Sequence, residues 1–320
     1  MEYGDKHILV LGAGASGIGA SWVLAQVGAH VVLNDYKPVT LPADEEKRLV
    51  SAGVDIITGR QDESLLDGVD RIVISPGISL DIPIVKAAQD RGIDVVSEVE
   101  LAYEVSKSPI VAVTGTNGKT TTTTLLTKVL EGSGKPVRVG GNIGDSLSEV
   151  AYSMPAGGFL VAELSSYQLE TIKHFRPIGA IMLNITPDHL ARHKTMENYI
   201  AAKERIFENQ LKSDYLVLNI DDSVVADMEH RAPSHILQIS QKQTVENGAY
   251  YANGQCYVVE NNVATAVIGD EDIHIPGSHN IENILTVIAL TYALGVPVVE
   301  IHRIISEFHG VEHRLERVKT

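Results

Sequence analysis

Short apolar runs rich in β-branched residues alternate with amphipathic segments along the first two thirds of the chain. This alternation predicts parallel β-sheets covered by helices. The predicted strands fall in two series, which suggests an α/β protein with two sheets. They are residues 7–12, 30–35, 54–58, 70–77 and 93–97, followed by 110–115, 137–141, 159–164, 178–184 and 214–220.

The pattern changes after about residue 233. Three further apolar runs, joined in part by Asn-Gly turns, read as a small antiparallel meander. Helices are predicted before and after this region, and the one that ends near Pro109 places a joint near residue 98. The meander is expected at residues 235–240, 249–262 and 263–269, and the helices at 97–109, 279–295 and 297–310.

Composition and charge narrow the class of protein. A chain of 320 residues with 44% hydrophobic and 21% charged residues has the size and apolar content of two domains. Its net charge of -15, without any basic run, argues against a nucleic-acid partner. The sequence has no recognisable signal peptide, and its apolar runs are all shorter than the roughly 18 residues needed to span a bilayer. With Cys256 as its lone cysteine, we expect a monomeric cytoplasmic protein with no membrane partner.

A glycine-rich loop follows the first predicted strand. Gly12, Gly14 and Gly17 satisfy G-x-G-x-x-G, and Asp35 ends the second strand 18 residues after the last glycine. Such a loop presents backbone N–H groups to a diphosphate at a positive helix end. From this motif alone, an NAD enzyme, a nucleotide-sugar binder and a purely structural glycine turn all remain open.

A second glycine loop, TGTNGKT at residues 114–120, follows the strand 110–115. It departs from the strict P-loop pattern because Val113 stands where that pattern has glycine. Lys119 is still placed to neutralise phosphate oxygens, and Thr120 can offer its hydroxyl to Mg²⁺. Two anion-binding loops predict two nucleotide-like ligands.

Candidate metal ligands lie at the ends of two other predicted strands. Glu163 ends a buried apolar run, where an unpaired carboxylate is costly unless it meets a cation. Asp188 and His189 follow another strand, in the loop position where α/β sheets collect ligands. His189 and His193 have zinc spacing, but Arg192 and Lys194 flank the second histidine, which therefore reads as solvated helix surface. On spacing alone, Lys203 reads as an ordinary helix-face lysine.

Several of these segments together resemble the ATP-dependent muramyl ligases of bacterial peptidoglycan synthesis. The shared signatures occur in the family's order, and the N-terminal segments resemble the branch that adds D-glutamate. The signatures are IVAVTGTNGKTT at 110–121, GGNIG at 140–144, VAELSSYQLE at 161–170, LNITPDHLARH at 183–193, AAKERIF at 201–207, HNIENI at 279–284 and GVEHRLE at 310–316.

The resemblance implies that ATP activates the carboxylate of UDP-N-acetylmuramoyl-L-alanine as an acyl phosphate, which the amine of D-glutamate then attacks. It assigns the UDP part of the substrate to Gly14, Ala15, Ser16, Asp35, Tyr36, Ser75 and Gly77, and the muramoyl-alanine arm to Asn142, Ser165 and Gln168. It assigns ATP to Gly115, Thr116, Asn117, Gly118, Lys119, Thr120, Thr121, Asn283 and Arg314.

The same resemblance implies two Mg²⁺ ions. Thr120 and Glu163 would serve the first ion and His189 the second. Lys203 would be carbamylated, so that it stands beside the metals as an anion. Lys119, Glu163, His189 and Lys203 would form the catalytic set.

The implied organisation has three parts. Residues 1–98 would form a Rossmann-like domain for the UDP substrate, and residues 99–309 a central ATP-binding domain of P-loop type. Residues 310–320 would begin a third domain, into which members of the family continue. We therefore expect this chain to be two domains of a ligase and not to complete the ligation by itself. A non-catalytic nucleotide-sugar binder and an NAD-dependent oxidoreductase remain the alternatives.

Overall fold

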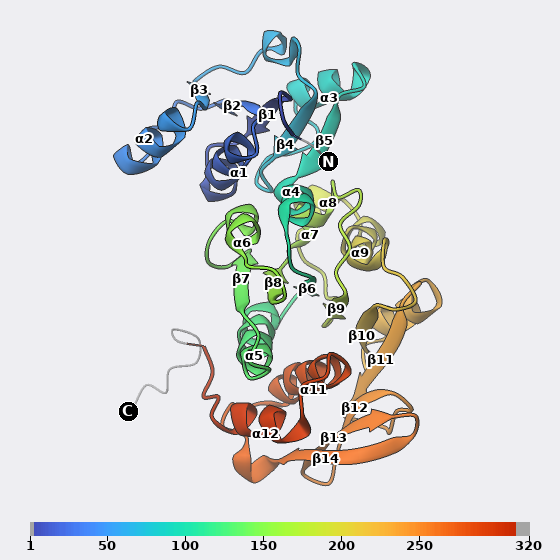
Figure 1. Ribbon diagram of the computed structural model, residues 1–320. Helices are drawn as coiled ribbons and strands as arrows, with labels where there is room; N and C mark the ends of the chain where they lie inside the picture. Colours follow the sequence, from blue (N-terminus) through green and yellow to red (C-terminus); the bar gives the residue numbers. More distant parts are fainter. Residues whose placement is uncertain (1–2, 312–320) are drawn as a thin grey trace, which may run out of the picture. The chain divides into compact units, whose positions relative to one another are not determined.

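The computed structural model describes residues 3–311, and residue contacts divide the chain into two compact units. The first unit holds the chain up to Lys107 together with residues 144–154 and 166–175. The second unit holds the remainder. Each unit has its own sheet (Figure 1), and neither unit is one continuous stretch of sequence.

The first unit contains a five-stranded parallel sheet with the order β3-β2-β1-β4-β5, which confirms the first series of predicted strands. The chain runs from β1 outward to β3 and then returns to the other side of β1. Doubly wound folds bind ligands at this reversal, beside the carboxyl ends of the strands. The strands are β1 (His7–Leu11), β2 (His30–Asp35), β3 (Asp55–Thr58), β4 (Arg71–Ile74) and β5 (Asp94–Ser97).

Alternate residues of β1 pack into two different cores, as the two-residue period of a strand requires. Ile8 and Val10 contribute to the core that includes α1, whereas Leu9 and Leu11 contribute to the core that includes α3. The sheet is therefore buried on both faces. The helices of this unit are α1 (Ala15–Gln26), α2 (Ala43–Ser51), η1 (Glu63–Leu66), α3 (Pro83–Asp90), α4 (Glu98–Val105), α6 (Leu147–Ser153) and α7 (Ser166–Leu169).

The second unit contains a nine-stranded sheet with the order β14-β13-β12-β11-β10-β9-β6-β8-β7. Strand pairs from β7 to β12 are parallel, whereas β12 with β13 and β13 with β14 pair in antiparallel fashion. The predicted meander is therefore wrong at its first strand, because β11 lies parallel to both of its neighbours. The strands are β6 (Ile110–Thr114), β7 (Val137–Gly141), β8 (Phe159–Glu163), β9 (Gly179–Met182), β10 (Tyr215–Asn219), β11 (His235–Ser240), β12 (Gly248–Ala252), β13 (Gln255–Glu260) and β14 (Val263–Gly269).

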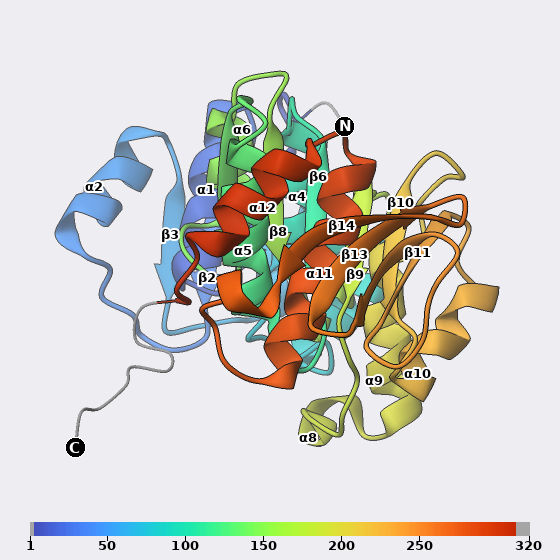
Figure 2. The same ribbon diagram turned by 90° about the horizontal axis from the view of Figure 1, so that it is seen from below.

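Every residue of β6 and β8 is buried, which explains why their sequences are nearly continuous apolar runs. Figure 2 shows α5, α11 and α12 on one side of this sheet, where their apolar residues join a single core. The helices of this unit are α5 (Lys119–Glu131), α8 (Leu190–His193), α9 (Met196–Glu204), η2 (Arg205–Phe207), α10 (Ser223–Ala226), η3 (Asp227–His230), η4 (Asp270–Asp272), α11 (Ser278–Ala293) and α12 (Val298–Ser306).

The threonine run at the start of α5 is unusual for a helix, because threonine has only modest helix propensity. Thr124 in this run and Thr127 after it donate their hydroxyls to the carbonyl oxygens of Thr120 and Thr123, one turn earlier, both at 2.8 Å. Such bonds satisfy the hydroxyls within the helix itself. Leu125, Leu126, Val129 and Leu130 supply the buried apolar face of α5.

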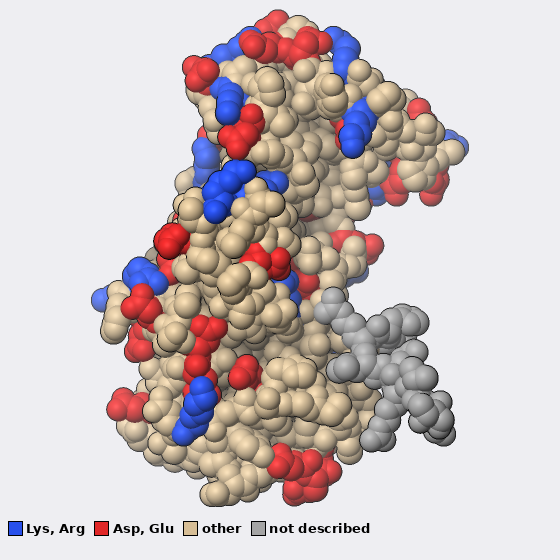
Figure 3. Space-filling model, turned by 180° about the vertical axis from the view of Figure 1, so that it is seen from behind, with Lys and Arg blue, Asp and Glu red and all other residues tan. Residues whose placement is uncertain are grey.

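The surface of the described residues carries mixed charges. On the face shown in Figure 3, Lys and Arg side chains are scattered among Asp and Glu, without a continuous basic patch in the part drawn. Within residues 3–311, no helix is both long enough and apolar enough to cross a bilayer.

Candidate active site

The glycines of the first loop have different structural roles. Gly12 has a φ of +101°, and a side chain there would collide with Ser75. A side chain at Gly17 would meet the carbonyl oxygen of Gly12 at 1.8 Å. At the N-cap of α1, however, the Cβ position of Gly14 has no atom within 4 Å. The exposed backbone at Gly14 and Ala15 can therefore receive an anion at a helix N-terminus.

Residues from β2 and β4 flank this loop. Asp35 accepts hydrogen bonds from the backbone N–H groups of Ala13 at 3.0 Å and Lys37 at 2.9 Å. Ser75, just after β4, donates its hydroxyl to the carbonyl of Gly12 at 3.3 Å. Tyr36 is 70% exposed. The structure thus brings Asp35, Ser75 and the glycine loop together at the reversal point of the first sheet.

Ser16 contacts a residue that the sequence patterns did not single out. Its hydroxyl bonds to Glu98, whose carboxylate also accepts hydrogen bonds from Ser146 and Ser148. Burial raises the pKa of the Glu98 carboxyl, and these donors oppose that shift. Glu98 therefore links α1, α4 and the start of α6 within the first unit.

The second loop joins β6 to α5 and curls around Lys119. Gly118 is the N-cap of α5 with a φ of +85°, and a side chain at Gly115 would meet Leu183 at 2.8 Å. The Lys119 Nζ atom donates to the carbonyl oxygens of Gly115 at 3.0 Å and Thr116 at 2.9 Å. The ammonium group therefore lies against the loop at the positive end of α5, a suitable place for phosphate oxygens.

Lys203 contacts the same loop. It is only 2% exposed, and its Nζ donates to Gly115 O at 2.7 Å and to Thr114 Oγ1 at 3.3 Å. Burial, with a smaller contribution from the charge of nearby Lys119, lowers the pKa of the Lys203 ammonium to about 7, and Asp188 opposes the shift. The default assignment of Lys203 as an ordinary helix-face lysine is therefore wrong.

Glu163 lies at the carboxyl end of β8, beside the second loop. It pairs in register with Val113 of β6 and is 1% exposed. Its Oε1 accepts from Asn142 Nδ2 at 3.0 Å, and its Oε2 has no hydrogen-bond partner among residues 3–311. A buried carboxylate oxygen without a donor is costly unless a cation meets it.

This orphaned oxygen fits an implied Mg²⁺ ion. Mg²⁺ commonly takes one or two carboxylates and completes its shell with water and phosphate oxygens. Glu163 can supply the carboxylate, and Thr120 lies in the first turn of α5, which packs against β8. Within the described part of the chain, no three His, Cys, Asp or Glu side chains form a metal-binding group. These residues therefore do not provide a complete set of protein ligands for a Mg²⁺ ion.

The two histidines near α8 have different environments. His189 is half exposed, with its Nε2 3.4 Å from Asp188 Oδ2. His193 is only 6% exposed, and its ring lies 5.3 Å from that of Tyr199. The prediction that His193 is solvated surface is wrong, because α8 is a single turn between His189 and Lys194, which both have a positive φ.

Tyr199 also lies at this site, although the motifs of the sequence do not include it. Its hydroxyl lies 3.1 Å from Thr116 Oγ1, and its ring lies 5.0 Å from Lys203 Nζ. One signal was available, because Tyr199 and Lys203 are four residues apart and so share a helix face.

The remaining predicted residues fall in several places. Asn117 and Thr121 belong to the second loop and the start of α5, and Asn117 N–H donates to Asn184 Oδ1 at 2.9 Å. Asn283 is buried on α11 beside Gly118. The contact division places Ser165 in the second unit and Gln168 in the first. Gly77, a predicted UDP-site residue, is exposed in the segment after β4. Arg314, a predicted ATP-site residue, lies outside the described residues.

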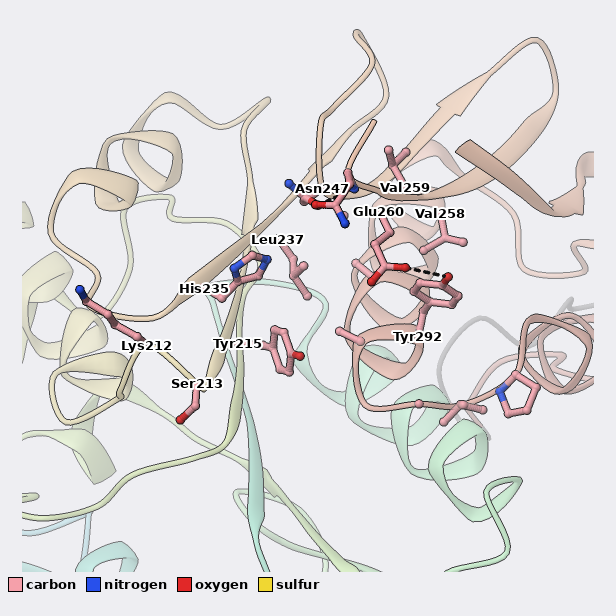
Figure 4. Close-up of a pocket in the computed structure, with 17 residues that line it drawn as sticks. Lys212, Ser213, Tyr215, His235, Leu237, Asn247, Val258, Val259, Glu260 and Tyr292 are labelled. Atoms are coloured by element: carbon pink, nitrogen blue, oxygen red, sulfur yellow. Dashed lines mark hydrogen bonds between the residues drawn. The ribbon is translucent and has the colours of Figure 1, made fainter. Parts of the chain in front are cut away.

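A separate hollow of about 600 Å³ lies in the second unit at the start of β10 and β11 (Figure 4). Its lining includes Tyr215, His235 and Tyr292, and the Tyr292 hydroxyl lies 3.4 Å from Glu260. None of the predicted site residues lines it. Because the strands are parallel, this end of β10 is opposite to the end where the second loop leaves β6.

Comparison with known proteins matches both parts of the chain. Residues 6–97 match the N-terminal domain of MurD-like Mur ligases, and residues 113–291 match the Mur ligase middle domain. The chain therefore belongs to the Mur ligase family, whose members use ATP and build peptidoglycan precursors.

Within that family, the chain is a homologue of UDP-N-acetylmuramoylalanine–D-glutamate ligase, or MurD. It is 44% identical over 318 residues to that ligase from Thermoanaerobacter pseudethanolicus and 42% identical over 319 residues to that from Halalkalibacterium halodurans. These alignments cover 99% and 100% of this chain and 70% of each relative.

Solved structures support the fold at lower identity. One is the UDP-N-acetylmuramate:L-alanyl-gamma-D-glutamyl-meso-diaminopimelate ligase from Neisseria meningitides, with a TM-score of 0.65 at 22% identity, covering 96% of this chain and 99% of that one. A murein peptide ligase from Psychrobacter arcticus gives a TM-score of 0.63 at 21% identity, covering 97% and 70%.

Proposed function

We propose that this chain carries the UDP-substrate and ATP sites of a ligase that joins D-glutamate to UDP-N-acetylmuramoyl-L-alanine. One observation carries the proposal: Lys119 and Lys203 both contact the carbonyl of Gly115, and the strand that ends in Glu163 pairs with the strand leading into that loop. A lysine cation, a buried lysine amine and a buried carboxylate around a helix N-terminus suit phosphoryl transfer between anions.

The reaction would proceed in two balanced steps. A carboxylate oxygen of the alanyl group attacks the γ-phosphorus of ATP, so that an acyl phosphate forms and ADP leaves. The amine of D-glutamate then attacks the acyl carbon, phosphate leaves with the electron pair of the broken C–O bond, and the amine loses a proton. Because two anions meet in the first step, Lys119 reduces their repulsion by neutralising phosphate charge.

Mg²⁺ would supply further charge neutralisation when bound. Thr120 and Glu163 would hold one ion, and His189 with carbamylated Lys203 would hold a second. The support for Glu163 is its orphaned Oε2, and the support for carbamylation is the lowered pKa of Lys203, because only a neutral amine adds to CO₂. Asn142, which donates to Glu163, would orient that carboxylate.

The first unit would bind the UDP part of the substrate. Gly14, Ala15 and Ser16 would present the diphosphate site at the start of α1, and Asp35 with Tyr36 and the turn at Ser75 would lie near the uridine. The positive end of α1 and the open space over Gly14 support this role. In the second unit, Asn283 would approach the adenine of ATP.

The division of labour can be tested by calorimetric titration of Lys119→Ala with MgATP and, separately, with UDP-N-acetylmuramoyl-L-alanine. We expect MgATP binding to weaken about 10- to 100-fold, as loss of a charged hydrogen bond predicts. Binding of the UDP substrate should stay within about twofold of wild type, because its proposed site lies on other residues.

The matched control is Lys128→Ala, an exposed lysine on the same helix, which should change neither titration. Equal loss of both ligands in Lys119→Ala would show that the assignment of one nucleotide to each loop is wrong. Tight binding of NADH with no binding of the UDP substrate would favour an oxidoreductase instead.

A further inference from the structure

Tyr199 is one of the largest fully buried side chains of the protein, with 1% exposure. It lies on α9, whose start is fixed by Thr195: the Thr195 side chain accepts from Asn198 N at the N-cap. The ring is in contact distance of His193 on one side, at 5.3 Å, and of Lys203 Nζ, at 5.0 Å. The side chain is therefore held in one place by its own surroundings.

The Tyr199 hydroxyl reaches the second loop through Thr116. Thr116 Oγ1 donates to Thr186 O at 3.2 Å and accepts from Thr186 N at 3.0 Å. A hydroxyl group has a single hydrogen to donate. Because the hydrogen of Thr116 can be directed to Thr186, the 3.1 Å contact between the two hydroxyls allows Tyr199 to donate to Thr116.

Thr116 in turn connects to the parts of the loop that would meet phosphate. Its backbone N–H donates to Asn184 O at 2.9 Å, and its carbonyl accepts from Lys119 Nζ at 2.9 Å. The Thr116 side chain and backbone together fasten the loop to residues 184–186. Tyr199 adds a third point of attachment from α9, the helix that also carries Lys203.

We propose that Tyr199 is a positioning residue for the nucleotide: its hydroxyl holds Thr116 so that the loop at 115–119 keeps the shape that binds a triphosphate. It acts through Thr116. The inference rests on the proposed function of this loop as the ATP site.

The test is a double-mutant cycle on MgATP affinity with Tyr199→Phe, Thr116→Val and the double variant. Tyr199→Phe removes the hydroxyl and keeps the buried ring. We expect Tyr199→Phe to weaken MgATP binding about three- to tenfold, the usual effect of one lost hydrogen bond. If Tyr199 acts through Thr116, the double variant should bind no more weakly than Thr116→Val alone.

Two controls separate this role from a general loss of stability. Tyr251 lies on β12, and its hydroxyl donates to Asp270 at 2.7 Å. Tyr251→Phe removes this bond of the second unit and should leave MgATP affinity unchanged. Binding of UDP-N-acetylmuramoyl-L-alanine should also stay unchanged in Tyr199→Phe. A general loosening of the protein would lower both affinities and would overturn the inference.

The outcomes distinguish the inference from the proposed function. If wild-type protein binds no MgATP, the function of the loop is wrong. If wild type binds MgATP and Tyr199→Phe binds it equally well, only the inference fails. Independent, multiplicative losses in the double variant would likewise show that Tyr199 does not act through Thr116.

Discussion

Lys203 should take up CO₂ at a pH far below that required by an exposed lysine. The reacting form is the neutral amine, and its fraction follows from the pKa. With a pKa of about 7 instead of 10.5, about 90% of the amine is neutral at pH 8, compared with about 0.3% for the ordinary value. The lowered pKa therefore increases the reactive fraction about 300-fold at that pH.

The sign of the pH dependence follows from the same shift. Below pH 7 the amine is charged and should form little carbamate, and carbamate should appear as the pH rises through about 7. The unfolded chain binds this proton more tightly between pH 7 and 10.5. This one group therefore makes folding more favourable as the pH rises through that window.

The assay is ¹³C NMR of the protein equilibrated with ¹³C-bicarbonate at pH values from about 6 to 9. Lys203→Met should remove the carbamate signal, whereas Lys128→Met should retain it, because Lys128 is exposed on α5. Lys119→Ala should move the midpoint to higher pH, because the Lys119 charge helps to lower the pKa of Lys203. A midpoint above about pH 9, or a signal that persists in Lys203→Met, would refute this reasoning.

Two further predictions concern the carboxyl end of β8. Glu163→Gln should weaken nucleotide binding about tenfold or more in Mg²⁺ but not in EDTA, with unfolding free energy unchanged or higher, since a buried oxygen loses its unpaired charge. Calorimetry and thermal melts measure these two effects, and Glu131→Gln, at an exposed glutamate, is the control. Equal weakening of nucleotide binding in Mg²⁺ and in EDTA would contradict the metal role of Glu163. Gly141→Ala should destabilise the protein by about 1–3 kcal/mol, because its φ is +110° and the new Cβ would meet Glu163 O at 2.4 Å. Gly134 also has a positive φ, but a Cβ there would have no atom within 4 Å, so Gly134→Ala is the control. An equal drop in melting temperature for the two variants would rule out the collision with Glu163 O as the cause.

The sequence predicted the strands and both loops because these depend on local patterns. Buried parallel strands read as apolar runs, and glycines at strand ends mark loops wherever they occur. β11 was misassigned because its sequence resembles that of the strands after it, and the direction of pairing is decided by the connection between β11 and β12. That connection leaves β12 parallel to β11.

Burial of single side chains was the part that sequence patterns could not supply. Lys203 and His193 look like surface residues from their neighbours, yet both are buried around Tyr199. Their burial depends on α8 being one turn long and on α9 lying beneath the second loop. Both features belong to the tertiary structure. The residues next to Lys203 in the sequence therefore do not indicate its lowered pKa. The family resemblance identified Lys203 but not the tyrosine that packs against it.

Residues 144–154 and 166–175, which belong to the first unit, affect how the two units can be expressed separately. The chain passes between the two units at residues 107/108, 143/144, 154/155, 165/166 and 175/176. A gene fragment cut after the first crossing would omit α6 and α7, and would expose the apolar surfaces of α1 and α4 that those helices cover. Expression of the first unit by itself would therefore need residues 144–154 and 166–175 to be joined to the chain up to Lys107.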